Sequence, residues 1–85
     1  MIQTAKITLE KGKSKQLCTH NSGYNVLLKV DAKNSVRVYL GGSNVTIESG
    51  FPLEPGEVQP LPKTDFSLFY VIAEKECTVY LLIWS

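Results

Sequence analysis

The amino-acid sequence predicts an all-β protein, and three observations lead to that fold class. Apolar residues recur at every second position, most cleanly in SVRVYL (35–40) and CTVYLLIW (77–84), which is the period of a β-strand. About seven such segments follow one another at spacings of about eight to twelve residues, with turn-forming residues between them. No segment carries apolar residues at helical spacing over a convincing length. We therefore predict a single small antiparallel β-sandwich or jelly-roll-like barrel formed by residues 1–85.

The predicted strands are, in chain order, residues 3–9, 14–20, 25–30, 35–40, 57–62, 66–73 and 77–84. Residues 14–20 alternate least clearly and form the weaker strand. Residues 57–62 include Pro60 and Pro62. Because proline has no N–H to donate to a neighbouring strand, this segment is predicted to lie at the edge of a sheet.

The segment YLGGSNVTIESGFPLEPGE (39–57) breaks the strand pattern. It holds four of the chain's six glycines and two of its four prolines, and we interpret it as a series of short, ordered reversals. Gly41 or Gly42, and Gly56, are expected to adopt positive φ in these turns, where alanine is resisted. Residues 45–47 suffice for a short strand or a single contact in a β-ladder, and Phe51 and Leu53 are expected to pack under the sheet.

The last two strands are apolar on both faces, whereas an antiparallel sheet with one wet face should alternate. Cys77, Val79, Leu81 and Ile83 are expected to face the interior. The other face needs a covering layer, which is either the chain's own loops or a neighbouring subunit. We favour the neighbour and predict an interface that another polypeptide covers, with Trp84 as its anchor. The predicted interface residues are Tyr80, Leu82 and Trp84, extended by Phe69 and Val71 on the preceding strand.

The charge balance argues against two classes of partner. Nine Lys and Arg residues against eight Asp and Glu residues leave a net charge of +1, which is too balanced for a surface that follows phosphates, so no nucleic acid is expected. The local excess of lysines in residues 6–15 is interpreted as a solvated edge. The first ten residues lack the apolar core of a signal peptide, and the longest apolar run, VYLLIW, is six residues. We therefore expect synthesis in the cytoplasm and no membrane partner.

No set of residues predicts catalysis, a metal or a cofactor. Cys18 and Cys77 lack CxxC spacing and are expected to be reduced and packed, the alternative being a disulfide within or between chains. His20 is the sole histidine. On one face of a strand, Cys18 and His20 would stand about 6–7 Å apart, which is long for a thiolate–imidazolium pair. We predict that the protein is not an enzyme.

One resemblance to a known family adds to these predictions. The run VRVYLGGSNVTIESGFPLEPGEV (36–58), followed by LFYVIAEKECTVYLL (68–82), resembles a pattern in small structural proteins of tailed bacteriophages. The resemblance implies a capsid decoration protein, of the head-stabilising or head-fibre kind, that is located in the virion after synthesis in the host cytoplasm. It also implies that the major capsid protein or another virion protein is the partner, with a homo-oligomer, a trimer by preference.

An alternative function is a carbohydrate-binding or receptor-binding module. Tyr24, Tyr39, Tyr70, Tyr80 and Trp84 are the aromatic residues that would form its sugar platform on a sandwich face. Packing in the core and at an interface is the simpler interpretation of the same side chains.

Overall fold

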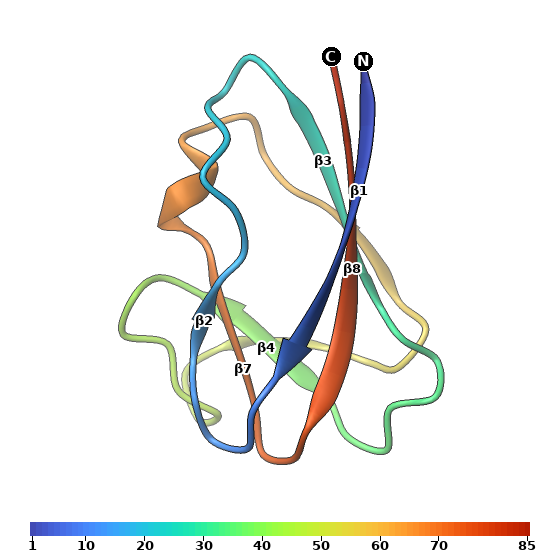
Figure 1. Cartoon of the computed structure of the whole chain (residues 1–85). Helices are drawn as coiled ribbons and strands as arrows, with labels where there is room; N and C mark the ends of the chain where they lie inside the picture. The colour runs from blue at the N-terminus through green and yellow to red at the C-terminus, as the bar shows by residue number, and fades with distance from the viewer.

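Eight strands form two antiparallel sheets, which confirms the predicted all-β class. The computed structural model describes residues 1–85. Its strands are β1 (Ile2–Leu9), β2 (Lys15–Gln16), β3 (Asn25–Val30), β4 (Val38–Gly41), β5 (Phe51–Leu53), β6 (Val58–Pro60), β7 (Tyr70–Ala73) and β8 (Cys77–Trp84). The first sheet has the order β1-β8-β3-β6 and the second the order β2-β7-β4-β5 (Figure 1).

The first sheet is organised around β8, which lies between β1 and β3. Strand β1 pairs with it over its whole length, from Ile2 opposite Trp84 to Leu9 opposite Cys77. Strand β3 pairs with the other side of β8, and β6 follows at the edge. Pro60 therefore lies where it was predicted, in an edge strand, whereas Pro62 follows the end of β6 and is in no strand.

The core lies between the two sheets. It consists of one cluster of buried side chains to which both sheets contribute, and Leu9, Leu28, Val30, Val38, Leu53, Phe66, Val71, Ala73 and Val79 are its fully covered members. Alternate residues of β8 point into it, as predicted, and none of these four exposes more than 3% of its surface. No helix of this chain has the length and apolar character that crossing a membrane requires.

Two of the predicted strands, 14–20 and 66–73, were too long at one or both ends. Of residues 14–20 only Lys15–Gln16 form a strand, which pairs with β7. Residues Phe66–Leu68 form a single 3-10 turn and not the start of β7. The Asp65 carboxylate accepts hydrogen bonds from the Ser67 N–H at 3.0 Å and the Ser67 hydroxyl at 2.6 Å, and this cap favours a turn over an extended chain.

The segment after β4 is ordered by its own polar side chains, as the interpretation of short reversals required. The Thr46 and Ser49 hydroxyls lie 2.8 Å apart, and the Gly50 N–H donates to the Thr46 carbonyl at 2.8 Å. Val45 is buried beside these turns, but it is not in a strand. Leu53 packs in the core as expected, whereas Phe51 is 57% exposed, because β5 is the outer strand of its sheet.

The predicted turn glycines divide into three cases. Gly56 has φ +87°, which confirms its positive φ. Neither Gly41 nor Gly42 has a positive φ, so that part of the prediction is wrong. Gly41 is required for space, because a Cβ there would lie 2.7 Å from Cγ2 of Val45; at Gly42 the nearest atom would be 3.8 Å away. The second glycine with positive φ, Gly12 at +68°, lies in the β1–β2 turn.

Candidate functional site

The larger of the two hollows in the molecule lies on the solvent side of the first sheet. Every second side chain of β1, β8, β3 and β6 points to this side, away from the core. We call this surface the outer face, made by Ile2, Thr4, Lys6, Leu27, Lys29, Val58, Tyr80, Leu82 and Trp84. The groove in its middle measures about 430 Å³. Neither hollow lies between the sheets.

The strand register arranges the outer face in rows that cross the sheet. Tyr80 has Lys6 on one side and Lys29 on the other, with Val58 beyond. The next row is apolar around Leu82, which lies between Thr4 and Leu27, and the row nearest the chain ends places Trp84 between Ile2 and Asn25. The face therefore changes from apolar near the termini to basic at the Tyr80 row.

Large apolar side chains remain accessible on this face. Ile2 is 75% exposed, Val58 48%, Leu82 37% and Tyr80 36%. Trp84 is half-buried, and its carbonyl accepts a hydrogen bond from the Asn25 side-chain amide at 3.4 Å. An exposed Leu, Tyr and Val lining one hollow is typical of a binding surface and not of scattered surface apolar residues.

Neither of the two lysines of the groove forms an ion pair with a carboxylate of the chain. The ion pairs of the protein are Lys13–Glu10 and Arg37–Glu54, and neither involves Lys6 or Lys29. The acidic group on this side is Asp31, whose carboxylate accepts a hydrogen bond from the Tyr80 hydroxyl at 3.5 Å. The groove thus combines an apolar floor with two free ammonium groups.

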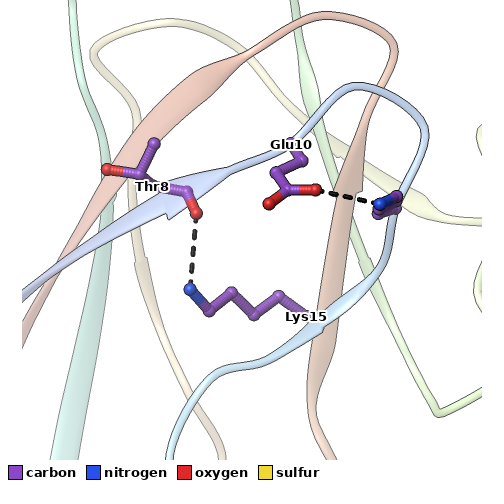
Figure 2. Close-up of polar contacts among 4 residues, drawn as sticks. Thr8, Glu10 and Lys15 are labelled. Carbon is purple, nitrogen blue, oxygen red and sulfur yellow. Dashed lines mark hydrogen bonds and ion pairs between the residues drawn. The ribbon is translucent and has the colours of Figure 1, made fainter.

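The second hollow is lined by polar residues, and Figure 2 shows polar contacts that these residues make with one another. It measures about 220 Å³ and lies at the β1–β2 turn. Lys15 Nζ donates to the Thr8 carbonyl at 3.5 Å, and Lys13 Nζ lies 3.1 Å from a Glu10 carboxylate oxygen. Its cations already have partners, so we place the candidate site on the outer face.

The residues considered for catalysis do not meet in a reactive arrangement. His20 Nε2 lies 3.2 Å from Gln3 Oε1, and the ring packs edge-on against Tyr24 with centroids 5.0 Å apart. Both cysteines are free thiols in this chain, and burial raises the pKa of Cys77. No three histidine, cysteine, aspartate or glutamate side chains gather as metal ligands would.

The predicted interface residues fall into two groups. Tyr80 and Leu82 lie on the outer face, as expected for their orientation, and Trp84 lies at its end. Val71 is fully buried and Phe69 packs against the core. Placing these two residues on the same patch was wrong, because β7 belongs to the second sheet and its Val71 face points inward.

The predicted aromatic platform is also divided by the fold. Tyr39 and Tyr70 belong to β4 and β7 of the second sheet, whereas Tyr80 and Trp84 belong to β8 of the first. Tyr24 packs against the core beside His20. No single face gathers these rings, so the carbohydrate-binding alternative loses its structural basis.

The groove residues Lys6, Lys29, Leu27 and Val58 were not predicted from the sequence. The alternation in NVLLKV places Leu27 and Lys29 on the face opposite Val26, Leu28 and Val30, so orientation was readable from the sequence. What the sequence did not show is that β1 and β3 both flank β8, which brings Lys6 and Lys29 to the two sides of Tyr80.

Comparison with known proteins gives a fold and no family. No family model and no curated protein matches this sequence. Among solved structures, the chain is similar to a cupin 2 conserved barrel domain protein from Salinispora arenicola, with a TM-score of 0.68 and 16% identity over 99% of this chain and 63% of that one. It is also similar to the plu4264 protein from Photorhabdus luminescens, with a TM-score of 0.66 and 17% identity over 99% of this chain and 62% of that one.

These similarities overturn the predicted phage resemblance. The chain is similar in fold to a cupin 2 conserved barrel domain protein and to the plu4264 protein, neither of which is described as a capsid decoration protein, and no family model or curated protein supports a function in the virion. The motif misled because its G-G-S and P-G pieces are turn chemistry, which any small β-protein requires between short strands. The chain spans just under two thirds of the length of these two structures, and the likeness at this identity concerns the fold alone.

Proposed function

We propose that this chain is a non-catalytic binding module that holds a small amphiphilic anion in the groove of its outer face. The observation that carries the proposal is the pairing of an apolar floor with two lysines that have no ion-pair partner. A volume of about 430 Å³ suits a small ligand, since such pockets usually measure about 300–1,000 Å³. The non-catalytic character is supported by the position of His20, whose ring contacts Gln3 and Tyr24.

The chemistry of the groove defines the class of ligand. An acyl or aryl body over Leu27, Leu82 and Val58 would lose its contact with water, which contributes about 25 cal/mol for each Å² of apolar area. A carboxylate or similar head group would lie above Tyr80, within the field of Lys6 and Lys29. An uncharged ligand of the same shape would form no ion pair with either lysine.

Charge also favours an anion over a second copy of the chain lying face to face on this groove. The sequence predicted that another polypeptide covers Tyr80, Leu82 and Trp84. Two copies stacked about a two-fold axis through the groove would bring both lysine pairs together, and like charges at close range are unfavourable. We therefore assign the groove to the small anion and not to a second copy of the chain.

The test compares decanoate with decanol, below their aggregation limits, by titration calorimetry and by the fluorescence of Trp84. We expect saturable binding of decanoate and at least tenfold weaker binding of decanol. Lys6→Gln combined with Lys29→Gln should weaken decanoate binding about tenfold, equivalent to about 1.4 kcal/mol, and leave decanol unchanged. Lys75→Gln, in the exposed β7–β8 turn, is the matched control. Equal affinity for the two probes, or no saturable binding, would show that the groove is not this kind of site.

A further inference from the structure

The two sheets have four edges, and three of them are poor templates for another strand. Strands β6 and β5 have three residues each and contain Pro60 and Pro52, and β2 has two residues. Short edges and prolines are the usual means by which proteins avoid pairing with other chains. Strand β1 is different: it has eight residues and no proline, and it pairs on one side only, with β8.

The backbone groups of β1 that point outward can be identified from two contacts. The Ser85 N–H donates to the Met1 carbonyl at 3.3 Å, so residues of odd number direct their N–H and C=O groups toward β8. The Thr8 carbonyl points away from β8 and accepts a hydrogen bond from Lys15 Nζ. Ile2, Thr4 and Lys6 therefore present their N–H and C=O groups at the open edge, and their side chains are all exposed.

We propose that a second copy of this chain pairs with that edge, β1 against β1 in antiparallel fashion, with the two-fold axis at Thr4. This register places Thr4 opposite Thr4 of the partner subunit and Ile2 opposite Lys6 of the partner subunit. All three residues with open backbone groups then form hydrogen-bonded pairs. Facing threonines are a favourable cross-strand pair, whereas like charges placed directly opposite are destabilising.

Neighbouring registers satisfy these conditions less well. An axis at Lys6 would set the two lysines directly opposite each other. An axis at Ala5 would bring Ile2 opposite Thr8, whose carbonyl already accepts a hydrogen bond from Lys15. An axis at Gln3 would leave Lys6 unpaired. The axis at Thr4 is the one that uses the whole open stretch and preserves the Lys15 contact.

The dimer would join two first sheets into one eight-stranded sheet whose outer faces are continuous. This inference goes beyond the proposed function and does not rest on it, because pairing at the edge uses backbone groups of β1 whereas the groove uses side chains of the outer face. A contact made by one strand is smaller than the roughly 800 Å² per partner of a standard interface. We therefore expect a dimer that forms reversibly with increasing concentration and not an obligate one.

The main test is Thr4→Pro, followed by sedimentation equilibrium over a series of concentrations without added ligand. The Thr4 N–H points away from β8, so proline removes no hydrogen bond within the chain, but it removes both N–H···O bonds across the axis. We expect the dissociation constant of the dimer to rise about tenfold or more, while Thr4→Val, which keeps the N–H, stays within about threefold of the wild type. A wild-type chain that remains monomeric at millimolar concentration, or a Thr4→Pro dimer as tight as wild type, would overturn the proposal.

A second variant tests the register and remains informative if Thr4→Pro fails to fold. In a Cys18→Ser background, Thr4→Cys places two thiols on facing residues whose Cα atoms would lie about 5.5 Å apart, within the range that a disulfide spans. We expect air oxidation to give a covalent dimer that a reductant dissolves. Lys29→Cys, equally on the outer face but two strands from the edge, should remain monomeric. Equal cross-linking of the two variants, or none at Thr4→Cys, contradicts pairing at this edge.

Discussion

The two faces of β8 have similar apolar side chains and different surroundings. On the inner face, Val79 and Leu81 expose 2% or less of their surface, whereas on the outer face Tyr80 and Leu82 expose 36% and 37%. The second sheet covers the inner face, and no element covers the outer one. Composition therefore does not reveal which face of a strand is the core, because an apolar face can serve the fold or be available for a ligand.

The largest expected difference in the free energy of unfolding is between substitutions of Leu81 and Leu82, two adjacent leucines on opposite faces of β8. Leu81→Ala leaves a cavity between the sheets and should lower the free energy of unfolding by about 2–5 kcal/mol. Leu82→Ala removes a side chain that water already reaches and should cost about 1 kcal/mol or less. Urea unfolding of both variants makes the measurement. Similar losses at the two positions would mean that the outer face is also part of the core.

A smaller effect on the free energy of unfolding is expected at Asn34, whose side chain pairs with β8 beyond the end of β3. The Asn34 amide donates to the Thr78 carbonyl at 2.8 Å, and the Thr78 N–H donates to the Asn34 side-chain oxygen at 3.0 Å. Asn34→Ala leaves the half-buried Thr78 N–H without a partner, whereas the Thr78 carbonyl keeps its hydrogen bond from the Asp31 N–H at 3.2 Å. The loss should cost about 1–3 kcal/mol. Thermal unfolding beside the control Ser35→Ala, at an exposed neighbour, checks this. An unchanged melting temperature would show that water replaces the amide without loss.

The buried thiol of the inner face predicts a dependence on alkaline pH. Burial raises the pKa of Cys77 above its ordinary value of 9.0, so the unfolded chain releases this proton at a lower pH than the folded one. The stability contribution is fully present below about pH 9 and is lost as the pH rises through the higher folded value. We expect Cys77→Ala to remove part of the alkaline decline seen in denaturation curves. A wild type and variant with parallel pH profiles would contradict this.

The smallest effect on the free energy of unfolding is expected for a substitution on the outer face. Tyr80→Phe removes one exposed hydrogen bond to Asp31 and should change the free energy of unfolding by no more than about 0.5 kcal/mol. The same variant keeps the aromatic ring in the groove, so decanoate binding should stay within about threefold of the wild type. A large loss of stability would mean that the Tyr80–Asp31 contact holds the 31–34 turn in place.

The sequence predicted the fold class and the inner face of β8 because both depend on a local signal, the alternation of side chains along a strand. It failed where the outcome depends on which strands are neighbours. Val71 and Phe69 have the same alternation as residues of β8, but Val71 belongs to β7 of the opposite sheet and Phe69 lies just before that strand. The groove was missed for the same reason, because it requires strands from both ends of the chain.

The turns teach a related lesson about glycine. Gly56 follows Pro55, and this pair predicts a positive φ that the structure has. At Gly41 the requirement comes from Val45, which folds back onto it, and a contact of that kind leaves no mark in the neighbouring residues. The φ of a turn can therefore be predicted from local composition, whereas a close approach between segments cannot.

The pairing of β1 with β8 also determines how this chain must fold. Strand β1 has no neighbour other than β8, so the two most distant strands in the sequence must meet before the first sheet acquires its edge. Closing so long a loop costs entropy before any contact repays it, and sheets built from non-local pairs fold in milliseconds to seconds, not in microseconds. Until that encounter, β8 can pair with β3 alone, and its other side stays open to any chain that reaches it first.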